Sequence, residues 1–331
     1  MLYYYALLYY NINLKQINTM KKIHLISTLI GLLAFSTISK ADLKVVTSIK
    51  PIHSLASYIM DGVGSPGLIV DGYNSPHNFQ LKPSHAKMLE QADIIFWVGE
   101  DLENFLEKPL DTIAKKAEKI ELLEIKGIKK LKFRERNIFE EHEGHDDHGH
   151  DAKKEEHDDH DDHGHGEYDP HIWLDPINAK VILNEITEHL IENDSKNAST
   201  YKSNLAKAIS EIDKLIIDVI TETNTDLSYV VFHDAYQYYE NRFNVNILGA
   251  MTVNPDVMPG AEQIHEIHEV IEHDNVSCIL SEPQFNPDII KSIAKDTNVK
   301  TGVLDPLGAN LKPGKDLYFD LIRNMSSSFN C

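Results

Sequence analysis

The chain has 331 residues and a formal charge of −20, from 32 Lys and Arg against 52 Asp and Glu. Apolar residues make up 42% and charged residues 25%, which is typical of a globular protein with a sizeable core and not of a disordered chain. The acidic balance argues against a nucleic-acid partner, whose phosphates attract Lys and Arg, and two cysteines are too few for a disulfide-knotted scaffold or a four-cysteine zinc finger.

The N-terminal segment is predicted to be a secretion signal. Residues 20–41 combine two lysines, an apolar stretch and small residues before a cleavage point after Ala41. The apolar stretch is shorter than the ~20 residues that a membrane span needs. We expect Met20 to be the natural start, with 1–19 as an upstream extension. Because no cysteine stands at the cleavage point, the expected product is a soluble periplasmic protein.

Short β-type runs alternate with helical patterns in two blocks of the chain. In the first block, strands are predicted at 43–49, 67–70 and 93–98, and helices at 52–60, at 83–91 and, after the third strand, up to 116. In the second block, strands are predicted at 229–232, 245–249, 278–281 and 300–304, and helices at 235–242, 260–273 and 287–295. Repeated alternation implies parallel sheets with helices on both faces. We therefore predict an α/β fold with two lobes of parallel β-sheet.

A helical segment separates the two blocks. Residues 178–191 are predicted to be helical, and 198–223 keep a helical apolar period through Leu205, Ile209, Ile212, Ile216 and Ile220. At ~1.5 Å per residue the second helix would span roughly 40 Å, long enough to run along both lobes. We interpret it as one rigid connector that permits only small motions. The predicted division is a first lobe at 42–196, a connector at 197–224 and a second lobe at 225–331.

Residues 140–167 form a low-complexity segment with eight His and thirteen Asp or Glu against two Lys. With a single apolar side chain it cannot offset the entropy of ordering, so we predict a mobile loop. Its His-x-x-His and His-x-His spacings bring imidazoles close enough to share an ion, and Zn²⁺ suits imidazole, as do Cu²⁺ and Ni²⁺. A solvated acidic spacer is the alternative. The predicted weak, multi-ion site comprises His142, His145, His148, His150, His157, His160, His163 and His165.

A tighter metal site would have to be assembled by the fold. His77, His233 and Asp305 each follow a predicted strand, and His171 lies in the loop that enters the connector helices. Ligands of open α/β sheets bind beyond the carboxyl ends of the strands. Three imidazoles and a carboxylate make a plausible tetrahedral Zn²⁺ set. Each histidine alone is more often structural, and it is their conjunction that indicates a site.

Six segments carry a resemblance to a known family: SIKPIH at 48–53, PHNFQLKPS at 76–84, DPHIWLDP at 169–176, FHDAY at 232–236, EPQF at 282–285 and LDPLG at 304–308. They resemble the zinc-uptake substrate-binding proteins of ABC importers (ZnuA type). The resemblance extends over essentially the whole chain after the secretion signal, and DPHIWLDP is highly specific.

The resemblance implies two lobes joined by a long helix, with Zn²⁺ in the interlobe cleft. By the same resemblance His77, His171 and His233 are the ligands, and Asp305 is the fourth candidate in competition with water. Pro76 stands where some zinc-binding relatives carry a carboxylate, so that alternative ligand is missing. Manganese-binding relatives have Glu at the position of His233, and imidazole suits Zn²⁺ better than Mn²⁺. The implied partner is a membrane permease, powered by a cytoplasmic ATPase.

The two cysteines fit the same interpretation. Two Cys in an oxidising periplasm are more often paired than free, and zinc-uptake binding proteins often have such a bridge. We predict a disulfide between Cys278 and Cys331 that staples the C-terminal helix to its lobe. A metal-ligand role for the thiols is the alternative.

Other classes of protein are less well supported by the sequence. The His-Glu-x-x-His spacing, the Gly-x-Ser-x-Gly elbow and the phosphate-binding loop are all missing, so we predict that the protein is no enzyme. We also expect it to be a monomer. A manganese- or iron-uptake binding protein on the same scaffold is the first rival. A zinc hydrolase with three His and an activated water is the second, and it needs a general base that the sequence does not identify. The third is a surface adhesin, against which the missing lipid-attachment Cys counts.

Overall fold

The computed structural model describes residues 42–331 except 135, 140–165, 254, 256 and 258. The predicted secretion signal lies outside the described residues, as do the eight histidines of the acidic segment. Both therefore stay predictions. Among the residues that are described, no helix is both long enough and apolar enough to cross a membrane.

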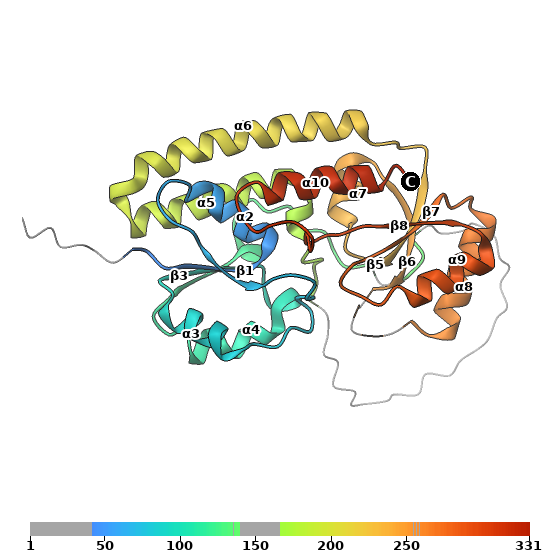
Figure 1. Cartoon of the computed structure of the whole chain (residues 1–331), viewed down its shortest axis with the longest axis horizontal. Helices are drawn as coiled ribbons and strands as arrows, with labels where there is room; N and C mark the ends of the chain where they lie inside the picture. Colours follow the sequence, from blue (N-terminus) through green and yellow to red (C-terminus); the bar gives the residue numbers. More distant parts are fainter. Residues whose placement is uncertain (1–41, 135, 140–165, 254, 256, 258) are drawn as a thin grey trace, which may run out of the picture. The chain divides into compact units, whose positions relative to one another are not determined.

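Two four-stranded parallel sheets lie within Leu43–Cys331, which is one compact unit (Figure 1). The first sheet has the order β2-β1-β3-β4, from β1 (Val45–Ile49), β2 (Gly67–Val70), β3 (Ile94–Trp97) and β4 (Glu118–Glu121). The second has the order β6-β5-β7-β8, from β5 (Ser228–His233), β6 (Asn246–Thr252), β7 (Cys278–Ser281) and β8 (Lys300–Val303). In the first sheet Val46 of β1 lies opposite Gly67 and Ile95. The predicted α/β class with two parallel sheets is confirmed.

The extent of burial explains which strands could be predicted from the sequence. All five residues of β1 and all four of β3 are buried, as expected of central strands covered on both faces. The edge strand β4 reads EKIE, and only Ile120 in it is buried. The sequence prediction missed β4 because one buried residue makes no apolar run. The helix expected up to 116 ends at Thr112, and β4 follows it.

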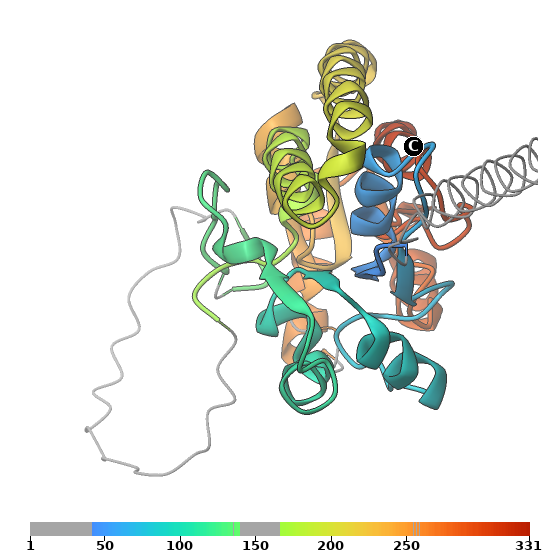
Figure 2. The same ribbon diagram turned by 90° about the vertical axis from the view of Figure 1, so that its left-hand side faces the viewer.

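Helices cover both faces of each sheet. They are α2 (Lys50–Ile59), α3 (Pro83–Gln91), α4 (Glu100–Thr112), α5 (Pro176–Asn193), α6 (Ala198–Glu222), α7 (Gln237–Phe243), α8 (Ala261–His273), α9 (Asp288–Thr297) and α10 (Leu317–Ser328). Figures 1 and 2 show α3 and α4 on one side of the first sheet and α2, α5, α6 and α10 on the other. Three short 3₁₀ turns lie at Leu122–Glu124, Ile172–Leu174 and Ser195–Asn197.

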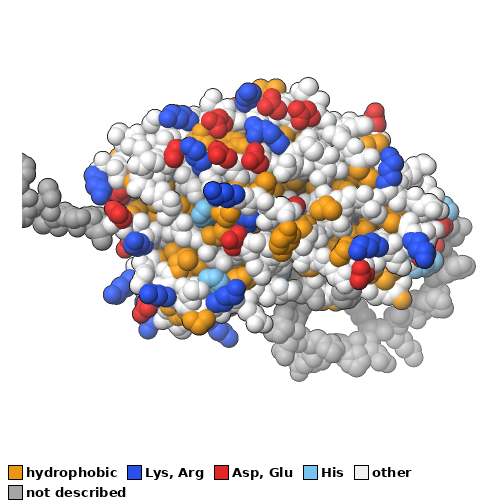
Figure 3. Space-filling model, in the orientation of Figure 1, with side chains coloured by type: hydrophobic (Ala, Val, Ile, Leu, Met, Phe, Trp, Pro, Cys, Tyr) orange, Lys and Arg blue, Asp and Glu red, His pale blue; other side chains and the backbone are white. Residues whose placement is uncertain are grey.

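The long helix α6 has 25 residues and packs on α2, α5 and α10. Its buried stripe is offset from the predicted one: Ile212 is buried, whereas Ile220 is 57% exposed. The stripe consists of Tyr201, Asn204, Ala208, Ile212, Leu215 and Val219. Asn204 is buried because its Nδ2 donates to the carbonyls of Ile59 and Asp61. Figure 3 shows charged side chains of both signs interspersed along the upper rim, where Figure 1 places α6.

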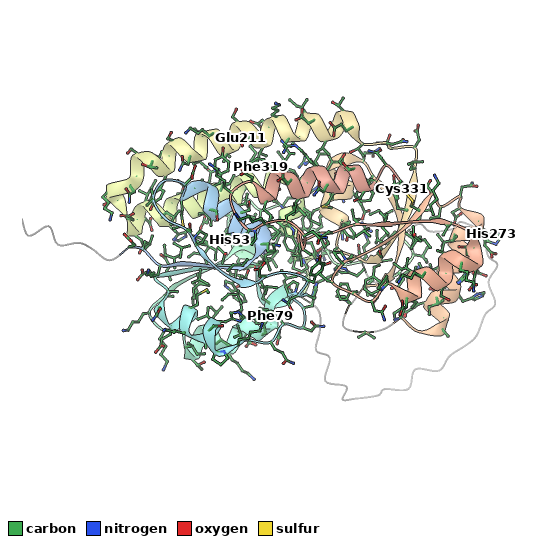
Figure 4. The ribbon with its side chains drawn as sticks, in the orientation of Figure 1. His53, Phe79, Glu211, His273, Phe319 and Cys331 are labelled. Carbon is green, nitrogen blue, oxygen red and sulfur yellow. A yellow bond between two sulfur atoms is a disulfide. The ribbon has the colours of Figure 1, made fainter. Side chains whose placement is uncertain are left out.

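The C-terminal helix α10 packs on α2 and α6. The chain then ends at Cys331, which lies near β7 and β8 (Figure 4). A disulfide joins Cys331 to Cys278, the first residue of β7. The C-terminal segment is therefore held by a helix of the first block, by the connector helix and, through the disulfide, by a strand of the second block. The predicted lobe boundaries stay a prediction.

Candidate metal centre

Three histidines from distant parts of the chain meet between the two sheets. Ligand nitrogens of His77, His171 and His233 all lie within 4.8 Å of one another. The Nε2 atoms of His171 and His233 are 3.3 Å apart. Two nitrogens ~2.0–2.1 Å from a tetrahedral zinc ion are about 3.3 Å apart. We call this group the histidine centre.

His77 lies on the loop that follows β2. Its backbone N–H donates to Ser75 Oγ. Two residues further on, the buried ring of Phe79 packs against Phe105 of α4 at 5.2 Å and against His85 of α3 at 5.4 Å between ring centroids. Figure 4 shows Phe79 beside these helices. The aromatic contacts thus anchor the loop that carries the imidazole.

His171 is oriented by a residue of its own motif. Asp169 Oδ1 accepts from the backbone N–H of His171 at 2.9 Å and lies 2.7 Å from its Nδ1. Trp173 Nε1 donates to the carbonyl of Pro306, which follows β8. Asp175 caps the N-terminus of α5 by accepting from the N–H of Ile177. Three side chains of DPHIWLDP therefore have separate structural roles: Asp169 orients the imidazole, Trp173 contacts the loop after β8, and Asp175 caps α5.

His233 is the last residue of β5, and its partner follows the neighbouring strand β7. Glu282 Oε1 lies 2.6 Å from His233 Nδ1 and 3.3 Å from its backbone nitrogen. Both side chains are buried. Because the strands are parallel, their carboxyl ends place the imidazole and the carboxylate side by side.

Both buried imidazoles direct the same nitrogen into the centre. A carboxylate only accepts hydrogen bonds, so pairing with Asp169 and Glu282 leaves the proton of His171 and of His233 on Nδ1. The two Nε2 lone pairs then face each other across 3.3 Å. Such an arrangement needs a proton or a metal ion between the nitrogens, and it matches the support that carboxylates give to metal-bound histidines.

Burial dominates the electrostatics. It lowers the pKa of His171 well below 6.5, and the nearby His233 acts in the same direction. Burial also acts to lower the pKa of His233, but the carboxylates of Glu282, Asp234 and Asp169 together outweigh it and the net direction is upward. Burial raises the pKa of Asp169 to about 7. A dication at the Nε2 atoms favours the ionised carboxylate, so ion binding and carboxylate ionisation reinforce each other.

A family model described as zinc-uptake complex component A, periplasmic, matches residues 45–330. The high-affinity zinc uptake system protein ZnuA of Brucella abortus (strain 2308) is 46% identical over 304 residues, which cover 86% of this chain and 90% of that protein. The chain belongs to the zinc-uptake component A family.

Solved structures share the fold of this family member. A crystal structure of ZnuA has a TM-score of 0.68 at 20% identity, covering 87% of this chain and 100% of that one. A Mn-bound periplasmic metal-binding protein from candidatus liberibacter asiaticus has a TM-score of 0.66 at 20% identity, covering 86% of this chain and 97% of that one. At such identities the likeness extends to the fold alone.

Asp305, the fourth candidate from the sequence, lies outside the set of mutually close ligand atoms. Its Oδ1 accepts from the N–H groups of Leu307 and Gly308 and from Gln284 Nε2, and its Oδ2 accepts from the N–H of Ala309. The carboxylate therefore organises the turn after β8. The cavity at the centre is lined by Ser75, Pro76, His77, His171, Trp173, His233, Glu282, Gln284, Phe285, Pro306 and Leu307.

Sequence reasoning missed the residues that support the histidines. Asp169 and Glu282 lie in segments that carried the resemblance, but their sequence spacing from the histidines did not predict that their carboxylates pair with the imidazoles. Arg134 had no sequence signal at all. Its Nη2 lies 2.7 Å from Glu240 Oε2 and its Nη1 3.4 Å from Asp234 Oδ1, so one guanidinium neutralises buried acids beside the centre.

Proposed function

We propose that this family member captures Zn²⁺ in the periplasm at His77, His171 and His233 and delivers it to the membrane permease of an ABC importer. Membership of the zinc-uptake family supports the transport role. The observation that carries the proposal for the ion is the meeting of three imidazoles, two of them with Nε2 atoms 3.3 Å apart and Nδ1 atoms paired with carboxylates.

The donor set favours zinc over manganese. Imidazole nitrogens suit borderline cations such as Zn²⁺, whereas Mn²⁺ prefers carboxylate and water oxygens. The Mn-bound structural relative shares the fold at 20% identity, and that likeness carries no argument about the ion. Zn²⁺ is therefore the proposed cargo, and a manganese- or iron-uptake protein is the rival.

The fourth coordination position is proposed for either Asp305 or a water molecule. The four hydrogen bonds that the Asp305 carboxylate accepts support water, because ligation would compete with them. Water at an open fourth position also suits a site that must release its ion, since fewer protein ligands have to be broken.

The proposal assigns no chemical reaction to the chain. It acts as a monomer that presents the bound ion to the permease, and a separate cytoplasmic ATPase supplies the energy of import. The acidic, histidine-rich segment at 140–167 is proposed to collect ions weakly beside the centre, where it would raise their local concentration.

Removing one ligand at a time tests the centre. Dividing ~10–16 kcal/mol of structural zinc binding over four ligands assigns about 2.5–4 kcal/mol to each, so His77→Ala, His171→Ala or His233→Ala should raise the Kd for Zn²⁺ roughly a hundredfold to a thousandfold. Competition against a fluorescent zinc chelator measures this Kd. Asp305→Asn in the same assay should change it only a few-fold if water is the fourth ligand.

Two controls decide what a loss of affinity means. Deletion of 140–167 should leave tight binding intact, and loss of tight binding on that deletion alone would show that the main site is elsewhere. If Mn²⁺ at a concentration similar to that of Zn²⁺ displaced the bound Zn²⁺, the result would favour the manganese-uptake rival.

A further inference from the structure

A second group of metal-ligating side chains lies at the end of the first sheet where its strands begin, whereas the histidine centre lies beyond the end where they finish. Glu118 is the first residue of β4, so it lies at the amino end of a parallel strand, whereas His77 follows the carboxyl end of β2. Glu185, His189 and Glu192 lie on α5. The i, i+4 and i, i+3 spacings place them on one face of that helix. We call these four residues the edge cluster.

The ligand atoms of the edge cluster converge. One ligand atom from each of Glu118, His189 and Glu192 lies within 4.8 Å of the others. His189 Nδ1 is 2.9 Å from Glu118 Oε1. The other oxygen of Glu118 accepts from Asn193 Nδ2 at 2.9 Å, which fixes the orientation of the carboxylate.

The imidazole of His189 is held as the histidines of the centre are. Its Nε2 lies 3.2 Å from Glu185 Oε1, one turn earlier on α5. When that pair takes the ring proton, the lone pair of Nδ1 faces Glu118 and Glu192. Nδ1 is buried and, among the described residues, has no partner in hydrogen-bond geometry, although Glu118 Oε1 is close. A nitrogen lone pair that faces carboxylate oxygens needs a proton or a metal cation between them.

We infer that the edge cluster is a second divalent-cation site, with His189 Nδ1, Glu118 and Glu192 as ligands and Glu185 as the carboxylate that holds the imidazole. One nitrogen and two oxygens suit Zn²⁺. The site is more open than the centre, because the side chains of His189 and Glu118 are 20% and 40% exposed, so water can complete the coordination. The inference goes beyond the proposed function and does not depend on it.

Histidine side-chain NMR of the purified ¹⁵N-labelled protein tests the site with Zn²⁺ as the probe. The ring signals of His189, assigned by their loss in His189→Gln, should shift during the titration, with Nδ1 taking the chemical shift of a metal-bound nitrogen. Glu118→Gln and Glu192→Gln should each weaken this binding about tenfold or more, and Glu185→Gln about tenfold to a hundredfold. The exposed Glu188, beside His189 on α5, supplies the matched control Glu188→Gln, which should change nothing.

Two results would overturn the inference. In one, both ring nitrogens of His189 are protonated at neutral pH and do not respond to Zn²⁺, so a proton fills the role of the cation. In the other, the His189 signals respond equally in Glu118→Gln, Glu192→Gln and the unaltered chain. Failure of the proposed function would appear elsewhere, in the signals of His77, His171 and His233, so the two outcomes are distinguishable. A thermal melt of each variant confirms that the fold is kept.

Discussion

The histidine centre and the edge cluster use the same unit, an imidazole with one nitrogen held by a carboxylate, in two different environments. In the centre both partners are buried, as for His233 and Glu282. In the edge cluster the side chains of His189 and Glu185 are 20% and 29% exposed. Burying carboxylates is costly unless a cation offsets the charge. The comparison indicates that the stability of the centre depends more strongly on a bound cation than that of the edge cluster, whose charges are partly screened by water.

The largest expected effect is therefore stabilisation by zinc through the centre. At a free Zn²⁺ concentration of 1,000 times Kd, binding to the folded state adds about 4 kcal/mol to the free energy of unfolding. For a protein of this size that should raise Tm by about 6–7 °C relative to the protein in EDTA. Differential scanning calorimetry measures the shift. His233→Ala should abolish most of it and His189→Ala should retain it. Equal losses in the two variants would contradict the difference between the sites.

A buried carboxylate that pairs with no imidazole extends the comparison, because it shows what burial alone does to an acidic side chain. Glu103 of α4 is fully buried, and its Oε2 accepts from the N–H groups of Val98 and Gly99. Burial raises its pKa to about 7. The unfolded chain loses this proton near pH 4.5, so the folded state binds more protons between these values. Stability from this residue is present below pH 4.5 and is lost as the pH rises through 7, by about 3 kcal/mol.

Replacing Glu103 by Gln isolates this effect. The amide oxygen can still accept from Val98 and Gly99 but carries no charge. Glu103→Gln should therefore be more stable than the unaltered chain at pH 8 by up to about 3 kcal/mol, and nearly equal to it at pH 4.5. Urea unfolding in EDTA at the two pH values measures the difference. The exposed Glu107 of the same helix supplies the control Glu107→Gln. A pH dependence unchanged in Glu103→Gln would refute the prediction.

Most of the fold could be predicted from the sequence because the central strands are continuous apolar runs. Strands β2 and β7 and helix α3 have the predicted bounds. Strand β4 could not be predicted, because its pairing with β3 holds it in the sheet while its side chains are mostly polar. The buried stripe of α6 is offset from the predicted one because buried positions depend on the neighbours α2, α5 and α10. Tertiary contact, and not periodicity alone, selects the face.

The candidate site was predictable in part for a related reason. Histidines after strands point to the carboxyl ends of parallel strands, and this rule places His77 beyond β2 of the first sheet and His233 at the end of β5 of the second. Their meeting depends on how the two sheets pack, which the rule does not give. The roles of Asp169 and Glu282 depend on side-chain contacts that sequence spacing does not encode. The edge cluster was not predicted because Glu118 lies on the strand that was missed. Its partners Glu185, His189 and Glu192 alone look like an ordinary solvent-facing stretch of helix.

The smallest expected effect is on zinc affinity, and it separates the charge of the supporting carboxylate from its role in orienting the imidazole. Glu282→Gln keeps an oxygen that can accept from His233 Nδ1 but removes the negative charge, and loss of such support typically weakens metal binding about tenfold to a hundredfold. Glu185→Gln is the matched change beside His189, and it should leave zinc affinity at the histidine centre unchanged. Chelator competition measures this affinity for both variants. Unchanged binding in Glu282→Gln would mean that the carboxylate only orients the ring. A loss in that range would show that the charge of this buried carboxylate helps to hold the ion.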